Sequence, residues 1–476
     1  MGSYGRLATR ALDTDVPVMV KILELGQSAK DALPLGQCPM ISDPYAHVEG
    51  SFSRVGFYLS RCILSHQSYP DMIQGAVYWK PPEEALEKVK QVAWEPSTSR
   101  YGTHEGLPEL TEALVNKLCH ENKLRNSGVM VTAGSNQGFL NLVLTLCDVA
   151  DSVVLFAPYF FNAYMSFQMT GINNILVGPS NPTTLLPDAD WLEEKLSESK
   201  PVPKLVSIVN PGNPSGICIP EPLLQVSLSL SHTHTHTHTE TKTNISTFAH
   251  PHTPAHACVC HNSTSTCFTQ RISDICRRAG SWLVVDNAYE YFVYDDFKHS
   301  CVEGNHVINL FSFSKAYGIM GWRVGYIAYS LEAEGLRTQL LKVQDNIAIC
   351  APMISQRVAL GCLEAGHEWV KIQVKHLLRN KELLTKALSP LGEDAIKGCE
   401  GAIYLWAKLP DKYPNDFEVV CWFAQKHGVM LLPGSACGVP GCIRITYGML
   451  RETECEVAAK RLRSGLEELI REGMVG

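Results

Sequence analysis

Strand-like and helical patterns alternate between residues 101 and 326, and this alternation constrains the fold more than any other feature of the chain. Five short apolar runs are rich in β-branched or aromatic residues and end at polar, Gly or Pro residues. They span residues 129–132, 152–156, 205–209, 282–285 and 307–311. Strands that alternate with helices form a mostly parallel sheet with helices on its faces. The sequence therefore predicts an α/β protein.

The length of the chain predicts more than one domain. Its 476 residues exceed the roughly 250 to 300 residues that one hydrophobic core usually serves. After about residue 350, two helical stretches (364–391 and 452–471) alternate with two short strands (403–408 and 443–447). We expect a large domain over residues 98–349, a smaller α+β domain over 350–476, and an N-terminal arm with part of the small domain over 1–97.

Composition argues against several classes of protein. The formal net charge is -7 and there is no long run of Lys and Arg, so the sequence predicts no nucleic-acid or membrane partner. No run of eighteen apolar residues is present, and the first residues lack the apolar region of a signal peptide. The 17 cysteines are scattered through the chain, which favours reduced thiols. We expect a cytoplasmic protein that acts on small molecules.

One segment, residues 226–270, breaks the pattern with Ser-Leu repeats and a strict His-Thr alternation over 232–239. Its His and Cys residues lack the spacing of a tetrahedral metal site, and no metal is expected. Such repeats follow from dinucleotide runs in DNA, so we interpret the segment as a retained intron that would be disordered. Without this segment, the residues on either side of it would form one continuous amphipathic helix with Leu224, Ile272 and Ile275 on one face. Residues 28–71 form a second doubtful segment.

The string from Ser312 to Arg323 carries the strongest chemical signal. Lys315 follows a predicted strand, and Arg323 lies eight positions later. A lysine amine attacks an aldehyde only when it is unprotonated, so a reactive lysine needs burial or a neighbouring cation. Arg323 could supply that cation and bind a phosphate, to which the Ser312 hydroxyl could also donate. A lone lysine after a strand is usually a surface residue, but the whole string favours a functional one.

This string occurs together with Asn-Pro-Gly-Asn-Pro-Ser-Gly at 210–216 and Asp-Asn-Ala-Tyr at 286–289. In this order the motifs resemble those of fold-type I pyridoxal-phosphate aminotransferases of class I/II. The resemblance extends from Gly75 to the C-terminus apart from the 226–270 segment. It is strongest to plant aromatic aminotransferases that act on methionine, aromatic amino acids and indole-3-pyruvate. It implies pyridoxal 5'-phosphate as the cofactor, held covalently by Lys315.

The resemblance also implies the cofactor contacts. The turn at 131–137 leads from a strand into a helix, whose N-terminus suits a phosphate. Asp286 would pair with the pyridine nitrogen, Phe160 would stack on the ring, and Asn213 and Tyr289 would bind the ring oxygen. Tyr101 would reach the phosphate of a neighbouring subunit, which implies a twofold homodimer. The full set is Tyr101, Gly134, Ser135, Asn136, Phe160, Asn213, Asp286, Tyr289, Ser312 and Arg323.

Amino acids and 2-oxo acids are the substrates that the resemblance implies. Arg444 would bind the substrate α-carboxylate, helped by Asn213 and the backbone of Gly75. Tyr78 and Trp79 could line an apolar side-chain pocket, or both could be core residues.

Three functions remain open from the sequence. The first is transamination, with Lys315 as general base and acid. The second is a lyase or synthase with the same fold and cofactor. The third is an inactive product that acts only as a binding module. The intact Lys315, Asp286, Arg323 and Arg444 argue against the third function, whereas the 226–270 segment argues for it.

Overall fold

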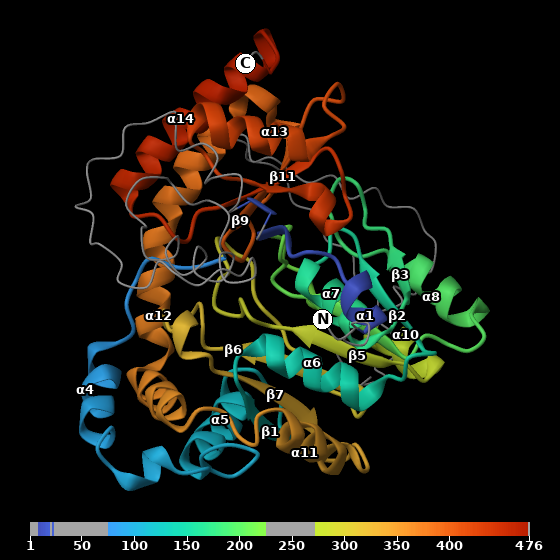
Figure 1. Cartoon of the computed structure of the whole chain (residues 1–476), viewed down its shortest axis with the longest axis vertical. Helices are drawn as coiled ribbons and strands as arrows, with labels where there is room; N and C mark the ends of the chain where they lie inside the picture. Colours follow the sequence, from blue (N-terminus) through green and yellow to red (C-terminus); the bar gives the residue numbers. More distant parts are fainter. Residues whose placement is uncertain (1–7, 20, 23–74, 225–271, 475–476) are drawn as a thin grey trace, which may run out of the picture.

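The computed structural model describes residues 8–19, 21, 22, 75–224 and 272–474 (Figure 1). Both segments that the sequence singles out as doubtful, 28–71 and 226–270, lie outside the described residues. The interpretation of 226–270 as a retained intron therefore stays a prediction.

A seven-stranded sheet forms the lower part of the molecule in Figure 1, with the strand order β1-β7-β6-β5-β4-β2-β3. Its strands are β1 (Ser127–Thr132), β2 (Ser152–Phe156), β3 (Asn174–Gly178), β4 (Leu205–Val209), β5 (Trp282–Asp286), β6 (Val307–Ser312) and β7 (Gly325–Ser330). The pairs from β3 to β6 are parallel, whereas β7 is antiparallel to β1 and β6. The predicted α/β class with a mostly parallel sheet is confirmed.

Helices cover both faces of this sheet because successive strand residues point to opposite sides. In β2, Val153 and Leu155 join one core cluster, and Val154 and Phe156 join another. The first cluster includes side chains of α6 (Ser135–Leu146), α7 (Phe161–Thr170) and α11 (Leu336–Ile347); the second includes those of α8 (Ala189–Glu198) and α10 (Ile272–Ala279). α5 (Pro108–His120) packs beside β1. Burial on both faces explains why these strands are continuous apolar runs.

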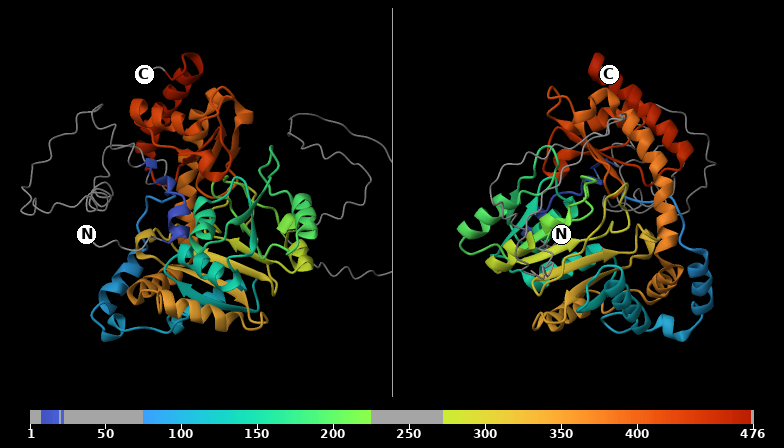
Figure 2. Two further views of the ribbon diagram at one scale, coloured as in Figure 1. Left: turned by 45° about the vertical axis from the view of Figure 1, so that its right-hand side comes forward. Right: turned by 180° about the vertical axis from the view of Figure 1, so that it is seen from behind.

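A small antiparallel sheet with the order β10-β11-β9-β8 occupies the upper part of Figure 1. Its strands are β8 (Ile396–Gly398), β9 (Tyr404–Lys408), β10 (Leu432–Pro433) and β11 (Cys442–Thr446), with helices α13 (Asp416–Trp422) and α14 (Glu452–Arg471). Figure 2 shows α12 (Met353–Ala387) running from the large sheet to the small one. The predicted helix 452–471 is confirmed.

The predicted helix 364–391 corresponds to the second part of α12, and the part that begins at Met353 was missed, because α12 consists of two helices joined at a kink at Gly366. Its first turns pack closely on α4 (Glu83–Val92), where a side chain at Gly361 would meet Ala85 Cα at 2.9 Å. Gly366 then interrupts the helix with φ 80°. Small residues that permit this packing weaken the apolar pattern by which a helix is recognised.

The two ends that flank residues 225–271 lie in one core cluster. α9 (Glu221–Leu224) ends with a fully buried Leu224, and α10 places Ile272 and Ile275 beside it at 0% and 2% exposure. The apolar face that the sequence predicts from these three residues is therefore buried.

The N-terminal residues 8–22 begin with α1 (Thr9–Asp13), which packs on α7. Val18 and Ile22 enter the cluster that also holds the core of the small sheet. The remaining short elements are 3-10 turns at Pro96–Ser99, Met320–Trp322, Ser389–Leu391, Glu393–Ala395 and Gly434–Cys437 and a π-turn at Phe423–His427. Among the described helices, none has the length and apolar character needed to cross a membrane.

The cysteines in the described part of the chain are all free thiols. Burial raises the pKa of most of them; for Cys276, Cys362, Cys437 and Cys455 the pKa reaches about 12.

Candidate active site

The predicted site residues gather where three parallel strands end side by side. Asp286 is the last residue of β5, and Ser312 is the last residue of β6. Asn213 lies in the loop that follows β4, and Lys315 lies in the loop that follows β6. Ligands of parallel sheets bind at this carboxyl edge. The fold therefore brings together chemistry from segments that are far apart in the sequence.

Lys315 is half-buried in this loop, and the pKa of its amine is lowered. Burial, reinforced by the cations Arg323 and Arg444, lowers the pKa of its amine from 10.5 to about 8, although Asp286 opposes the shift. At pH 7 about a tenth of such amines are unprotonated, compared with about one in three thousand at the ordinary pKa. Lys315 can therefore act as a nucleophile or a base near neutral pH.

Arg323 and the start of α6 form a site for an anion. Arg323 adopts a positive φ of 54° and its Nη1 donates to the Met320 carbonyl at 2.8 Å. Its guanidinium lies against Gly134, where any side chain would collide with it and where φ is 82°. Ser135 begins α6, so backbone N–H groups and a fixed cation converge here. Asn136 is exposed next to them.

Asp286 is a carboxylate that the fold holds away from solvent, at 9% exposure. One of its oxygens accepts a hydrogen bond from the Ala288 N–H at 2.9 Å. Burial raises its pKa to about 6, although the bond from Ala288 and the nearby Lys315 oppose the shift. A buried anion of this kind is stabilised by a bound cation such as a protonated ring nitrogen.

Arg444 connects the small sheet to the large one. It lies on β11 at 2% exposure, and its Nη1 donates to Asn213 Oδ1 at 2.8 Å. Its guanidinium carbon also lies 4.3 Å from the ring centre of Tyr404. The hydroxyls of Tyr404 and Tyr289 form a hydrogen bond, and a side chain at Gly75 would collide with Tyr404. Five residues from five segments thus meet at one place.

The remaining predicted residues differ in how deeply they are buried. Phe160 precedes α7, is half-buried, and lines a cavity of about 40 Å³ together with Asn213. Tyr101 is 80% exposed at the surface of the single chain. Trp79 is 7% exposed, stacks on Phe292, and donates to the carbonyl of Ala316 at 3.3 Å. These contacts favour the alternative that Trp79 is a core residue.

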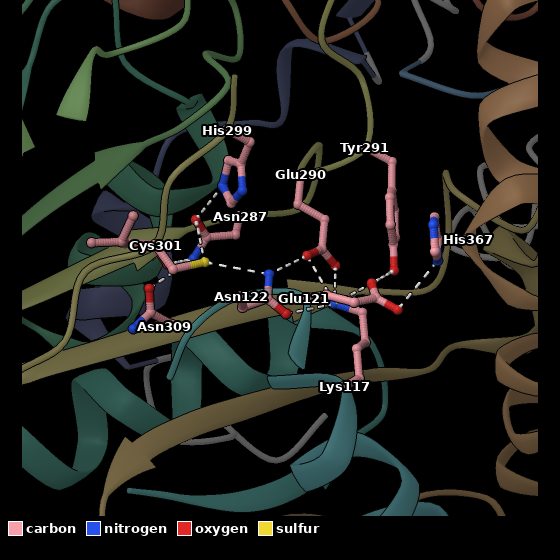
Figure 3. A network of polar contacts seen from close by, with 11 residues as sticks. Lys117, Glu121, Asn122, Asn287, Glu290, Tyr291, His299, Cys301, Asn309 and His367 are labelled. Atoms are coloured by element: carbon pink, nitrogen blue, oxygen red, sulfur yellow. Dashed lines mark hydrogen bonds and ion pairs between the residues drawn. The ribbon is translucent and has the colours of Figure 1, made fainter. Parts of the chain in front are cut away.

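A polar network that the sequence pattern did not reveal supports the turn after β5 (Figure 3). Lys117 of α5 donates to both carboxylate oxygens of Glu290 at 2.9 Å and to Asn122 at 2.8 Å. The side chains of Lys117 and Glu290 are only 6% and 9% exposed. Because Glu290 directly follows Tyr289, this buried ion pair anchors the turn after β5 that carries Tyr289.

A second part of the network is centred on Asn287, the residue that follows Asp286 in the chain. Asn287 Oδ1 accepts a hydrogen bond from His299 Nε2 at 2.8 Å, and the Asn287 amide nitrogen donates to Asn309 Oδ1 at 3.1 Å (Figure 3). Burial lowers the pKa of His299 to about 3, so its ring is neutral. Asn287 lies within the motif at 286–289, but the sequence pattern gave it no role, and His299 and Asn309 are common polar residues in a loop or strand.

The residues present fit pyridoxal phosphate. The cation and glycine at Arg323 and Gly134 suit a phosphate, the buried Asp286 suits a ring nitrogen, and the Lys315 amine suits an aldehyde. Within the described ranges, no group of His, Cys, Asp and Glu could hold a metal ion.

Comparison with known proteins identifies the family of the chain. The family model described as aminotransferase class I and II matches residues 70–239 and 251–462. The chain belongs to this family. This aminotransferase is 49% identical to the Arabidopsis thaliana protein named aromatic aminotransferase ISS1, over 476 residues and 100% of both chains. It is also 26% identical, over 77% of its own length and 70% of the relative's, to the bifunctional aspartate and glutamate/aspartate-prephenate aminotransferase of Petunia hybrida.

Solved structures share the fold of the aminotransferase. An aminotransferase from Mycobacterium tuberculosis superposes with a TM-score of 0.72 at 19% identity, covering 98% of this chain and 100% of the other. The aromatic aminotransferase of Pyrococcus horikoshii OT3 gives a TM-score of 0.68 at 22% identity, covering 87% and 99%. The family implies pyridoxal phosphate as the cofactor and amino acids and 2-oxo acids as substrates.

Proposed function

We propose that this enzyme moves the amino group of methionine or an aromatic amino acid to an aromatic 2-oxo acid such as indole-3-pyruvate. The observation that carries the site assignment is the position of Lys315, a half-buried amine with a lowered pKa among Arg323, Arg444 and Asp286. The name of the relative with 49% identity supports the aromatic substrate class.

Residues at the ends of five strands, β1, β2, β4, β5 and β6, and in the loops that follow them would hold the cofactor. Arg323, Ser312 and the segment from Gly134 to Asn136 would bind the phosphate, and Phe160 would pack on the ring. Asp286 would keep the ring nitrogen protonated, while Asn213 and Tyr289 would bind the ring oxygen. When bound, pyridoxal phosphate supplies a covalent attachment point for the amino group and a ring that accepts electrons from the substrate α-carbon.

Lys315 would hold the cofactor between turnovers and move protons during them. Its Nζ takes the proton from the substrate α-carbon when the amine is unprotonated, and returns a proton in the second half of the transfer. The lowered pKa raises the fraction of unprotonated amine, and the nearby cations that lower it also hold the anionic groups of the reactants.

Arg444 would bind the substrate α-carboxylate through its planar fork of donors. Its burial at 2% exposure makes this contact stronger than it would be in water. The Gly75 backbone lies beside Tyr404 and Tyr289, where a side chain would not fit, and its N–H would assist. The α-carboxylate would thus be placed between the two sheets.

For the donor side chain, the candidates are two half-buried aromatic residues: Tyr78, which lies three positions after Gly75, and Phe160, which lines a cavity with Asn213. They support an apolar or aromatic donor, because a donor with a second carboxylate would need a further cation.

We also propose a twofold homodimer in which Tyr101 reaches the phosphate of the neighbouring subunit, since 80% of its side chain is exposed in one chain. The proposed domain boundaries at residues 97 and 349 separate the large sheet from the small one. The scattered cysteines favour a reducing compartment such as the cytoplasm.

A panel of amino donors, each assayed with an aromatic 2-oxo acid, tests the substrate class. We expect kcat/KM for methionine, tryptophan, tyrosine and phenylalanine to exceed that for aspartate and glutamate by at least about tenfold, the difference of roughly 1.4 kcal/mol that one unmatched charge readily costs. A preference for aspartate or glutamate would refute the proposal. Variants that lack 226–270 should be assayed in parallel.

A further inference from the structure

Tyr404 is a buried residue that touches the residues assigned to both reactants. It lies on β9 at 1% exposure and pairs with Thr446 of β11. Arg444 lies two residues before Thr446 on the same strand, so Arg444 and Tyr404 are diagonal neighbours on one face of the small sheet. The guanidinium carbon of Arg444 is 4.3 Å from the centre of the Tyr404 ring. This distance is that of a cation–π contact in a desolvated place.

The other end of Tyr404 reaches the large sheet. Its hydroxyl bonds to that of Tyr289, which lies in the turn after β5, and the two rings meet edge to face with centres 5.5 Å apart. Tyr289 is itself 2% exposed. One side chain thus contacts the arginine assigned to the substrate and the tyrosine assigned to the cofactor.

The number of hydroxyl protons determines which of the two tyrosines donates in the hydrogen bond between Tyr404 and Tyr289. Burial raises the pKa of Tyr404 and Tyr289, so both phenols keep their single proton at neutral pH. If Tyr289 donates its proton to the ring oxygen of the cofactor, it can only accept from Tyr404. A donor behind Tyr289 polarises its O–H and strengthens the bond that Tyr289 makes.

We propose that Tyr404 is a positioning residue for amino-group transfer: its ring orients the guanidinium of Arg444 toward the substrate carboxylate, and its hydroxyl donates to the oxygen of Tyr289. This inference rests on the proposed function. It goes beyond the packing role that a buried strand tyrosine usually has, because phenylalanine would fill the same space without the hydroxyl.

Two substitutions separate the ring from the hydroxyl. Tyr404→Phe keeps the ring under Arg444 and removes only the donor. We expect the pH midpoint of the visible absorbance of the bound cofactor to rise by ~0.5 unit, because the anionic ring oxygen loses hydrogen-bond support. The KM for amino donors should change by less than about twofold.

Tyr404→Leu removes the ring as well. Here we expect the KM for amino donors to rise by about 2- to 30-fold, the range that corresponds to a lost cation–π contact, with the same absorbance shift as in Tyr404→Phe. If the leucine variant does not fold, Tyr404→Met replaces it. If Tyr404 only fills space, these variants would be less stable, but Tyr404→Phe would not shift the absorbance midpoint selectively and Tyr404→Leu would not add a selective rise in KM.

The outcomes distinguish this inference from the proposed function. An unchanged absorbance midpoint in Tyr404→Phe, or an unchanged KM in Tyr404→Leu, overturns the inference while Arg444→Ala still raises KM and borohydride still fixes the cofactor on Lys315. If Arg444→Ala leaves KM unchanged, or borohydride fixes the cofactor on another lysine, the proposed function fails and the inference fails with it.

Discussion

The ion pair between Lys117 and Glu290 gives a prediction about how the turn that follows Asp286 is held. Lys117 is 8% exposed, and its Nζ makes two bonds of 2.9 Å to Glu290 and one of 2.8 Å to Asn122. The same Nζ lies 5.2 Å from the ring centres of Tyr291 and Phe311, so aromatic faces surround the cation. A buried ammonium group among aromatic rings is stable only while its carboxylate partner, Glu290, is present.

Replacing Lys117 by Met leaves Glu290 with a buried negative charge. Removing one partner of a buried pair costs about 3 to 5 kcal/mol, which corresponds to a decrease in Tm of roughly 5 to 10 °C in a domain of this size. The double variant Lys117→Met/Glu290→Gln should recover part of the loss, because no charge is then left unpaired. Differential scanning calorimetry or thermal unfolding followed by tryptophan fluorescence, at one fixed scan rate, measures these shifts.

The same substitution at an exposed pair is the control. Lys371 pairs with Glu368, but their side chains are 58% and 71% exposed, so Lys371→Met should leave Tm almost unchanged. If Lys117→Met shifts Tm no more than Lys371→Met does, or if Glu290→Gln does not rescue it, the buried pair does not hold the turn as we argue.

Three further outcomes are expected at the candidate site. Arg444→Ala should raise the KM for amino donors by about 10- to 150-fold, the equivalent of roughly 1.5 to 3 kcal/mol, and should leave the cofactor absorbance intact. The control is Arg463→Ala at an exposed position, which should leave KM unchanged. If Arg444→Ala also loses the cofactor, Arg444 is misassigned. Asp286→Asn should keep the cofactor but lose most turnover, because a neutral amide supports ring protonation poorly, and near-normal kcat would remove Asp286 from that role. In the protein stripped of cofactor, Lys315 should capture an aldehyde faster as pH rises and reach its limiting rate above a pKa of about 8 instead of 10.5; a midpoint near 10.5 would contradict the lowered pKa.

Much of the large sheet could be predicted because its central strands are apolar on both faces. The predicted strands 152–156 and 205–209 match β2 and β4, since a continuous buried run has clear ends at polar residues. β3 was missed because it is an edge strand of five residues with exposed Asn174 and Val177. β7 was also missed, and its antiparallel direction depends on how the chain returns to β1, which a local pattern does not contain.

At the candidate site, the sequence predicted residues that belong to motifs but not the residues that support them. Lys315, Arg323 and Asp286 stand in recognisable strings, and the structure brings them close enough to shift the pKa of Lys315. Tyr404 carries no such signal, because a tyrosine in an apolar strand is usually a core residue. Its contact with Tyr289 joins segments 115 residues apart and follows only from the packing of the two sheets. Its contact with Arg444 follows from the pairing of β9 with β11.

The buried thiols have a consequence for how opening of this protein can be followed. With a pKa of about 12, Cys362 on α12 and Cys437 near the candidate site have about one thiolate in ten thousand molecules at pH 8, and alkylating reagents attack only the thiolate. A transient opening that wets these residues restores ordinary acidity and reactivity. The rate of alkylation of each cysteine therefore reports how often the surrounding part of the core opens to solvent, and the buried cysteines are built-in probes of local unfolding.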